Sequence, residues 1–172
     1  MKVLLLLFLG IFGFGHVDAT EPKFIALDSK DTEMKKAYAL TANTIYQFID
    51  LVKAGGEGEH MAKLRFRNPD LSEELGKDQF LYIWLSNVAY HPEEKILSGV
   101  FFEVPKELKK WHQVGQRLGF ESDDVFDWMV NDNGKVKGGF TIRVARNKLK
   151  SEKEKLEYDK YIGVSSYESI NY

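Results

Sequence analysis

Acidic residues whose spacing could support catalysis gather between positions 123 and 127 of the 172-residue chain. On a helix Asp124 and Asp127 would share one face, and a buried, paired aspartate can acquire the raised pKa that general acid catalysis needs. The structural alternative is that Asp123 or Asp124 caps a short helix while Asp127 accepts backbone hydrogen bonds. If the region is catalytic, we expect Asp127 to act as general acid or base and Arg143 to hold an anion.

The segment after these aspartates is also a candidate binding surface. The Asn133-Gly134 step predicts a hairpin turn, because it tolerates the positive φ angles of a type I′ turn. Residues 140–145 alternate between apolar and polar types, which predicts the return strand. Gly138-Gly139 would leave a bulge, or room for a ligand or another backbone. The binding candidates in and near this hairpin are Trp84, Asp127, Trp128, Gly138, Gly139, Thr141 and Arg143. The structural alternative is that Trp128 belongs to the core and Arg143 pairs with Asp127.

A second, smaller cluster combines aromatic and basic side chains. Trp111 and His112 follow Lys106, Lys109 and Lys110. This cluster could contact an acidic partner, or it could be an exposed helix anchored by its tryptophan.

Several kinds of chemistry find no support in the sequence. The chain has no cysteine, which excludes disulfides, thiolate metal sites and cysteine nucleophiles. His60, His91 and His112 lack the spacing of metal ligands, and the glycine-rich segment 55–58 follows a helix instead of preceding one, unlike a phosphate cradle. The formal net charge of −2 gives no reason to expect nucleic acid as a partner. We therefore expect no metal and no cofactor.

The N-terminus has the pattern of a cleavable signal peptide. A charge at Lys2 precedes an apolar run over residues 3–14, and Ala19 is the expected cleavage site. The apolar run is shorter than the ~20 residues that span a bilayer, so we expect no stable membrane insertion after cleavage. The predicted organisation is a signal peptide over residues 1–19, a leader over 20–30 and a single domain over 31–172. The predicted location is periplasmic or secreted.

Periodicity supplies the elements of that domain. Apolar residues at steps of three and four predict a helix from Met34 to Val52, ended by Gly55. A capping box, Ser151 to Glu154, predicts a last helix over 152–161. The strands are predicted at 62–67, 79–90, 95–104, 116–120, 128–130 and 140–145, with 68–78 as a loop and a short helix after Pro105. The fold class is therefore α+β, with an N-terminal helix packed on a mainly antiparallel sheet of five or six strands and a C-terminal helix.

The hairpin region resembles a known family. Asp127-Trp128-Met129, then Asn133-Gly134-Lys135, then residues 138–144 resemble the YegJ-like domain of unknown function number 2314. This resemblance implies an α+β fold and membership among bacterial, often envelope-associated proteins, with no established reaction. Many members carry a Glu-His pair shortly before the tryptophan that Trp84 matches, and here Leu81 and Tyr82 occupy those places.

The function that fits the sequence best is that of a non-catalytic binding module for a protein or peptide. An inhibitor or immunity-type role against another envelope protein would suit the size of the chain, by analogy only. The alternative is a small envelope hydrolase or lyase that uses Asp127 and Arg143. A purely structural envelope component is a third class.

Overall fold

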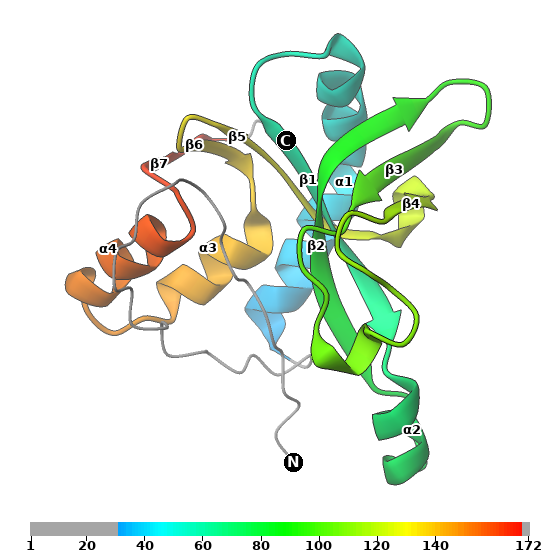
Figure 1. Cartoon of the computed structure of the whole chain (residues 1–172). Helices are drawn as coiled ribbons and strands as arrows, with labels where there is room; N and C mark the ends of the chain where they lie inside the picture. The colour runs from blue at the N-terminus through cyan, green and yellow to red at the C-terminus, as the bar shows by residue number, and fades with distance from the viewer. Residues whose placement is uncertain (1–30, 170–172) are drawn as a thin grey trace.

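The computed structural model describes residues 31–169, which form one seven-stranded sheet with helices on it (Figure 1). The strands are β1 (Glu59–Arg67), β2 (Phe80–His91), β3 (Ile96–Val100), β4 (Arg117–Phe120), β5 (Val125–Asp132), β6 (Lys135–Gly138) and β7 (Ser166–Tyr167). The helices are α1 (Thr32–Ala54), α2 (Pro69–Leu75), α3 (Phe140–Asn147) and α4 (Glu152–Tyr161), with short 3-10 turns η1 (Lys106–Leu108) and η2 (Ser122–Asp124). The sheet order is β4-β3-β2-β1-β5-β6-β7, and only β6 and β7 pair in parallel. The α+β class with a mainly antiparallel sheet is confirmed, although the strand count is seven.

The helix α1 ends where the sequence predicts. Asp31 is its N-cap and accepts from the backbone N–H of Glu33 and Met34, while Gly55 ends it in the left-handed conformation at φ 63°. The buried side chains of α1 are Met34, Ala37, Thr41, Thr44 and Phe48. The predicted signal peptide and leader lie outside the described residues.

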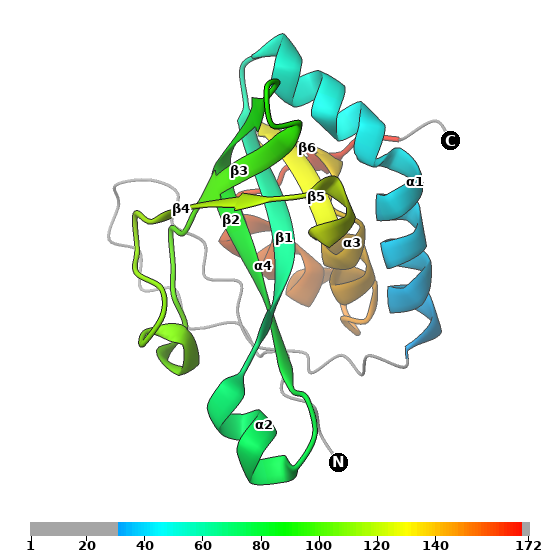
Figure 2. The ribbon, with the colours of Figure 1, turned by 90° about the vertical axis from the view of Figure 1, so that its right-hand side faces the viewer.

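Both faces of the sheet are covered. Figure 2 shows α1 along one side of the sheet, α4 behind β1 and β2, and α3 between β5 and α1. Ala62 and Leu64 of β1 belong to the larger core, which includes residues of α1, whereas Met61 belongs to a second core with Ile142 and Ile162. Apolar and basic residues alternate over 62–67, which predicts a half-buried strand with Lys63 facing solvent. This prediction is wrong at Lys63, which is 8 % exposed.

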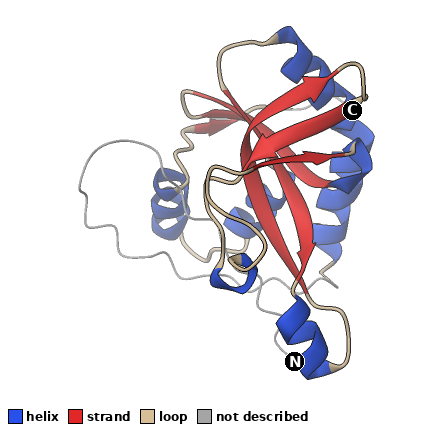
Figure 3. Ribbon diagram, turned by 45° about the vertical axis from the view of Figure 1, so that its right-hand side comes forward, coloured by secondary structure: helices blue, strands red, loops and turns tan. Residues whose placement is uncertain are grey.

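Two predicted elements differ in type. Residues 140–145 are not a strand, because β6 stops at Gly138 and α3 starts at once. Gly138 and Gly139 both have positive φ, at 79° and 66°, which turns the chain out of the sheet. The predicted loop 68–78 contains α2, which Asn68 caps through its side chain and Gly76 ends in the left-handed conformation. Figure 3 shows α2 projecting beyond the ends of β1 and β2.

The close approach at Gly138 gives a stability test. A Cβ at this position would lie 2.2 Å from the carbonyl oxygen of Trp128 and 2.7 Å from its ring, so neighbouring backbone would have to move. We expect Gly138→Ala to lower the free energy of unfolding by more than about 3 kcal/mol. Gly76→Ala is the matched control, because Gly76 has φ 62° with nothing within 4 Å of the added Cβ, and it should lose only about 1–2 kcal/mol. Equal losses in urea unfolding followed by circular dichroism would contradict the close-approach argument.

Candidate functional site

Asp127 is the centre of a buried polar cluster. Its Oδ1 accepts from the backbone N–H of Trp128 at 2.8 Å and of Phe140 at 3.1 Å. Its Oδ2 accepts from the backbone N–H of Thr141 at 2.7 Å and from the hydroxyl of the same residue at 2.6 Å. Asp127 therefore caps α3 from a neighbouring strand, in place of a local N-cap side chain, since Gly139 stands at that position.

Lys63 completes the cluster, and no sequence pattern singled it out for this position. It lies opposite Asp127 in the register of β1 and β5, and its Nζ donates to the Thr141 hydroxyl at 3.0 Å. Its ammonium also lies 5.6 Å from the ring centre of Trp84, its neighbour on β2. We name Lys63, Asp127 and Thr141 the polar node.

Burial and charge act against each other in the polar node. Burial lowers the pKa of Lys63 to about 8, although the facing Asp127 raises it in part. Burial likewise raises the pKa of Asp127 above its ordinary value, while Lys63 and the hydrogen bonds from Thr141 and Phe140 work in the opposite direction. A proton shared within such a set could serve acid–base chemistry only if substrate could reach it.

The two tryptophans among the candidates lie on different faces of the sheet. Trp128 stacks on Phe48 of α1 at 5.4 Å, and its Nε1 donates to Thr44 at 3.1 Å. Trp84 lies in the second core. Both are at most 2 % exposed, so neither ring can touch a partner in this structure.

Arg143 lies on α3 and has other partners than the polar node. It donates to the carbonyl oxygens of Gly138 at 2.9 Å and of Glu168 at 2.8 Å, and its guanidinium lies 5.0 Å from the ring centre of Tyr167. These contacts fasten β6 and the segment after β7 to α3. In these contacts Asp127 caps α3, whereas Arg143 links α3 to β6 and to Glu168.

Leu81 and Tyr82 lie on β2, where the family resemblance implies a Glu-His pair. Leu81 is buried in the larger core. Tyr82 stacks on Tyr38 of α1 at 6.0 Å and meets the edge of Phe126 at 5.2 Å. Both side chains therefore serve packing.

The exposed candidate lies in the loop between β3 and β4. Trp111 is 46 % exposed and Val114 is 65 % exposed. The expectation that Trp111 anchors this segment is wrong, because Leu108 is the buried anchor, at 2 % exposed, and His112 stacks on Phe101 at 4.7 Å. The tryptophan is left on the outside because the 3-10 turn directs Leu108 inward.

Basic side chains surround this exposed tryptophan. Lys106, Lys109 and Lys110 are all exposed, and Lys110 lies 5.7 Å from the Trp111 ring centre. Lys110 also pairs with Asp70 of α2 at 3.0 Å. We name Trp111, Val114 and these three lysines the Trp111 surface.

The described part of the chain lacks two other kinds of feature. Within residues 31–169, no group of three or more His, Asp or Glu side chains is arranged to hold a metal ion. Nor does this range contain a helix with the length and apolar character needed to cross a membrane.

Comparisons with known proteins give one family and one partial relative. The model of the family described as "Uncharacterized protein conserved in bacteria (DUF2314)" matches residues 31–165. A protein of Neisseria meningitidis serogroup B that is named as an ankyrin repeat protein is 31 % identical over 83 residues, which is 48 % of this chain and 31 % of that protein. The match therefore spans less than a third of the relative's length. No solved structure matches the chain significantly.

The lowered pKa of Lys63 predicts a pH-dependent stability. Below pH 8 the folded protein carries a buried ammonium, whereas above pH 10.5 the lysine is neutral in both the folded and the unfolded chain. The unfolding free energy of the wild type, relative to Lys63→Met, should therefore rise by about 3 kcal/mol between pH 8 and 10.5. Groups that titrate in this range without contacting Lys63 are shared by both proteins and cancel in the difference; Asp127 does not, because Lys63 lowers its pKa, and it is protonated more readily in Lys63→Met.

Chemical unfolding at a series of pH values measures this difference. Lys153→Met is the control, because Lys153 is exposed on α4, and its difference from wild type should stay flat. A flat difference for Lys63→Met as well would refute the lowered pKa.

Proposed function

Since the chain belongs to the DUF2314 family of uncharacterised bacterial proteins, we propose that it is a non-catalytic binding module that recognises a protein or peptide. The observation that carries this proposal is the exposed Trp111 on an anchored loop. A large aromatic ring is costly to leave in water, and tryptophan is among the residues that dominate the energy of protein interfaces.

The loop under the Trp111 surface is held in place by its own hydrogen bonds. The backbone N–H of Phe101 donates to Gln116 at 3.0 Å, and that of Gly115 donates back to Phe101 at 2.7 Å. Leu108 accepts from the N–H groups of both Trp111 and His112. A preorganised loop loses little conformational entropy on binding, which favours recognition.

Charge indicates the chemistry of the partner. The segment 105–116 carries Lys106, Lys109 and Lys110 against a single acidic residue, Glu107, and of these lysines Lys110 also pairs with Asp70 of α2. An acidic protein segment that places an apolar side chain against Trp111 and its carboxylates toward these lysines would be complementary. The relative from Neisseria adds modest support, because its name refers to a repeat architecture whose stacked units form extended binding surfaces.

The hydrolase or lyase alternative has weaker support. Asp127 is 0 % exposed and its two oxygens already accept four hydrogen bonds. A general acid or base must come within hydrogen-bond reach of the substrate, and this geometry offers no such approach.

Photo-crosslinking tests the binding proposal. A photoreactive amino acid at position 114 should form an adduct with one acidic protein, and the adduct should be lost in Trp111→Ala and weakened at least ~10-fold in Lys109→Glu. Both variants change exposed side chains, so thermal unfolding should be unchanged. Position 156 is the matched control, because Leu156 is 69 % exposed on α4. Equal labelling from both positions, or none from either, would overturn the proposal.

We further propose that this module works outside the cytoplasm, as a periplasmic or secreted protein. The charged start, the short apolar run and Ala19 support this proposal. Expressed from its full reading frame in a bacterial host, the protein should be recovered in the periplasm or medium with Thr20 as its N-terminal residue, as measured by intact mass. Ala19→Phe should block that cleavage, because the peptidase needs a small residue there. Recovery of an uncleaved wild-type chain from the cytosol would contradict the proposal.

A further inference from the structure

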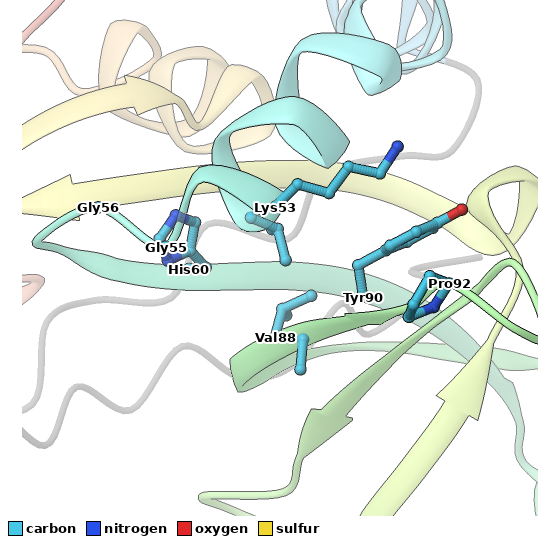
Figure 4. A pocket seen from close by; sticks show the side chains of 9 residues that line it. Lys53, Gly55, Gly56, His60, Val88, Tyr90 and Pro92 are labelled. Atoms are coloured by element: carbon cyan, nitrogen blue, oxygen red, sulfur yellow. The ribbon is translucent and has the colours of Figure 1, made fainter.

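A cavity that is largely open to solvent lies between the C-terminal end of α1 and the hairpin of β2 and β3 (Figure 4). Its volume is about 490 Å³, which falls within the range of about 300–1,000 Å³ that small-molecule sites occupy. Val52, Val88 and Ala89 give it apolar surface, and Tyr90 and Pro92 line it at the hairpin end. The cavity is distant in sequence from the Trp111 surface and shares no residue with it.

The rings of His60 and Tyr90 lie at the two ends of the cavity. Figure 4 shows His60 near Gly55 and Gly56, at the opposite end from Tyr90. Burial lowers the pKa of His60, although hydrogen bonding to the carbonyl groups of Leu51 and Gly58 raises it in part. At neutral pH the imidazole is therefore mainly uncharged, and it adds to the apolar lining.

The charge of the cavity is positive. Lys53 is the one ionised side chain among its lining residues, which all lie in the described part of the chain. The Lys53 ammonium lies 4.4 Å from the ring centre of Tyr90 and is exposed to solvent. It can thus pair with an anion without leaving the aromatic face.

The end of α1 determines where such an anion sits. The carbonyl end of a helix repels negative charge. The anion is therefore excluded from the part of the cavity next to Gly55. The Lys53 side chain reaches away from that end toward Tyr90 (Figure 4). A bound anion therefore belongs at the Tyr90 end, with the apolar part of the ligand over Val52 and Val88.

We propose that this cavity binds a small ligand that combines one carboxylate with an aromatic or branched apolar group. The apolar group lies between His60 and Tyr90, and the carboxylate pairs with Lys53. A free aromatic acid and the C-terminal residue of a peptide both carry these groups. The proposal is independent of the binding function assigned to the Trp111 surface.

An NMR titration with defined probes tests the site. 3-Phenylpropionate should shift the backbone amide signals of Lys53, Gly55, His60 and Tyr90 with a Kd on the order of 1 mM or below, and its neutral amide should bind several-fold more weakly. Lys53→Gln should weaken the acid about two- to fivefold, to the level of the amide, and leave the amide unchanged. Lys153→Gln is the matched control and should change neither.

A further variant and a further probe complete the test. Ala89→Leu should narrow the cavity and abolish binding of both probes; if it does not fold, Lys53→Gln still decides, since Lys53 is exposed. N-acetyl-alanyl-phenylalanine binding more tightly than phenylpropionate would identify a peptide C-terminus, and the reverse order would identify a free acid. No shifts around the cavity, shifts confined to the Trp111 surface, or an acid that binds Lys53→Gln as well as wild type would each overturn the proposal.

Discussion

The arrangement of the C-terminal half depends on one carboxylate. Asp127 accepts two hydrogen bonds at each of its oxygens, and three of the four donors belong to the first two residues of α3. Because Lys63 joins the same cluster through Thr141, the central strand β1, the strand β5 and the start of α3 are tied at one point. Loss of one member of a buried charged cluster typically costs about 3–5 kcal/mol, since the remaining charge is left without its partner. The residues that look most like a catalytic centre in the sequence therefore serve to join a sheet to a helix.

This connection explains why some of the fold could be predicted from the sequence and some could not. The last helix was predicted to the residue, because Ser151 and Glu154 cap it with side chains of its own segment. The hairpin turn at Asn133-Gly134 was equally local. By contrast, α3 was predicted as a strand, because its cap comes from Asp127, more than ten positions away, and nothing beside Phe140 marks a helix start. Only tertiary structure supplies that signal.

The candidate site, too, could be predicted only in part from the sequence. The sequence singled out Asp127, Thr141 and the paired glycines, which do meet around the start of α3, but it took Lys63 for a solvent-facing residue. Whether Lys63 is buried depends on which element covers the second face of β1, and this could not be known while α3 was taken for a strand. Trp111 is the opposite case, since only the geometry of the turn decides whether it or Leu108 faces the core. The helix α2 was missed although its signals, Asn68-Pro69 and Gly76, were local.

The attachment of α2 has a consequence for how recognition could diversify in this fold. A backbone hydrogen bond of 2.8 Å joins Asn68 and Gln79, where the segment that contains α2 leaves and rejoins the sheet. The register of β1 and β2 is therefore set before the chain leaves the sheet. Beyond that base, α2 touches the Trp111 loop through the exposed Asp70–Lys110 pair and presents Leu75 to solvent. Substitutions in this segment, or its replacement by a segment of another length, would alter the edge of the Trp111 surface and leave the sheet intact. Under the proposed binding function, such an arrangement would let partner choice change separately from folding.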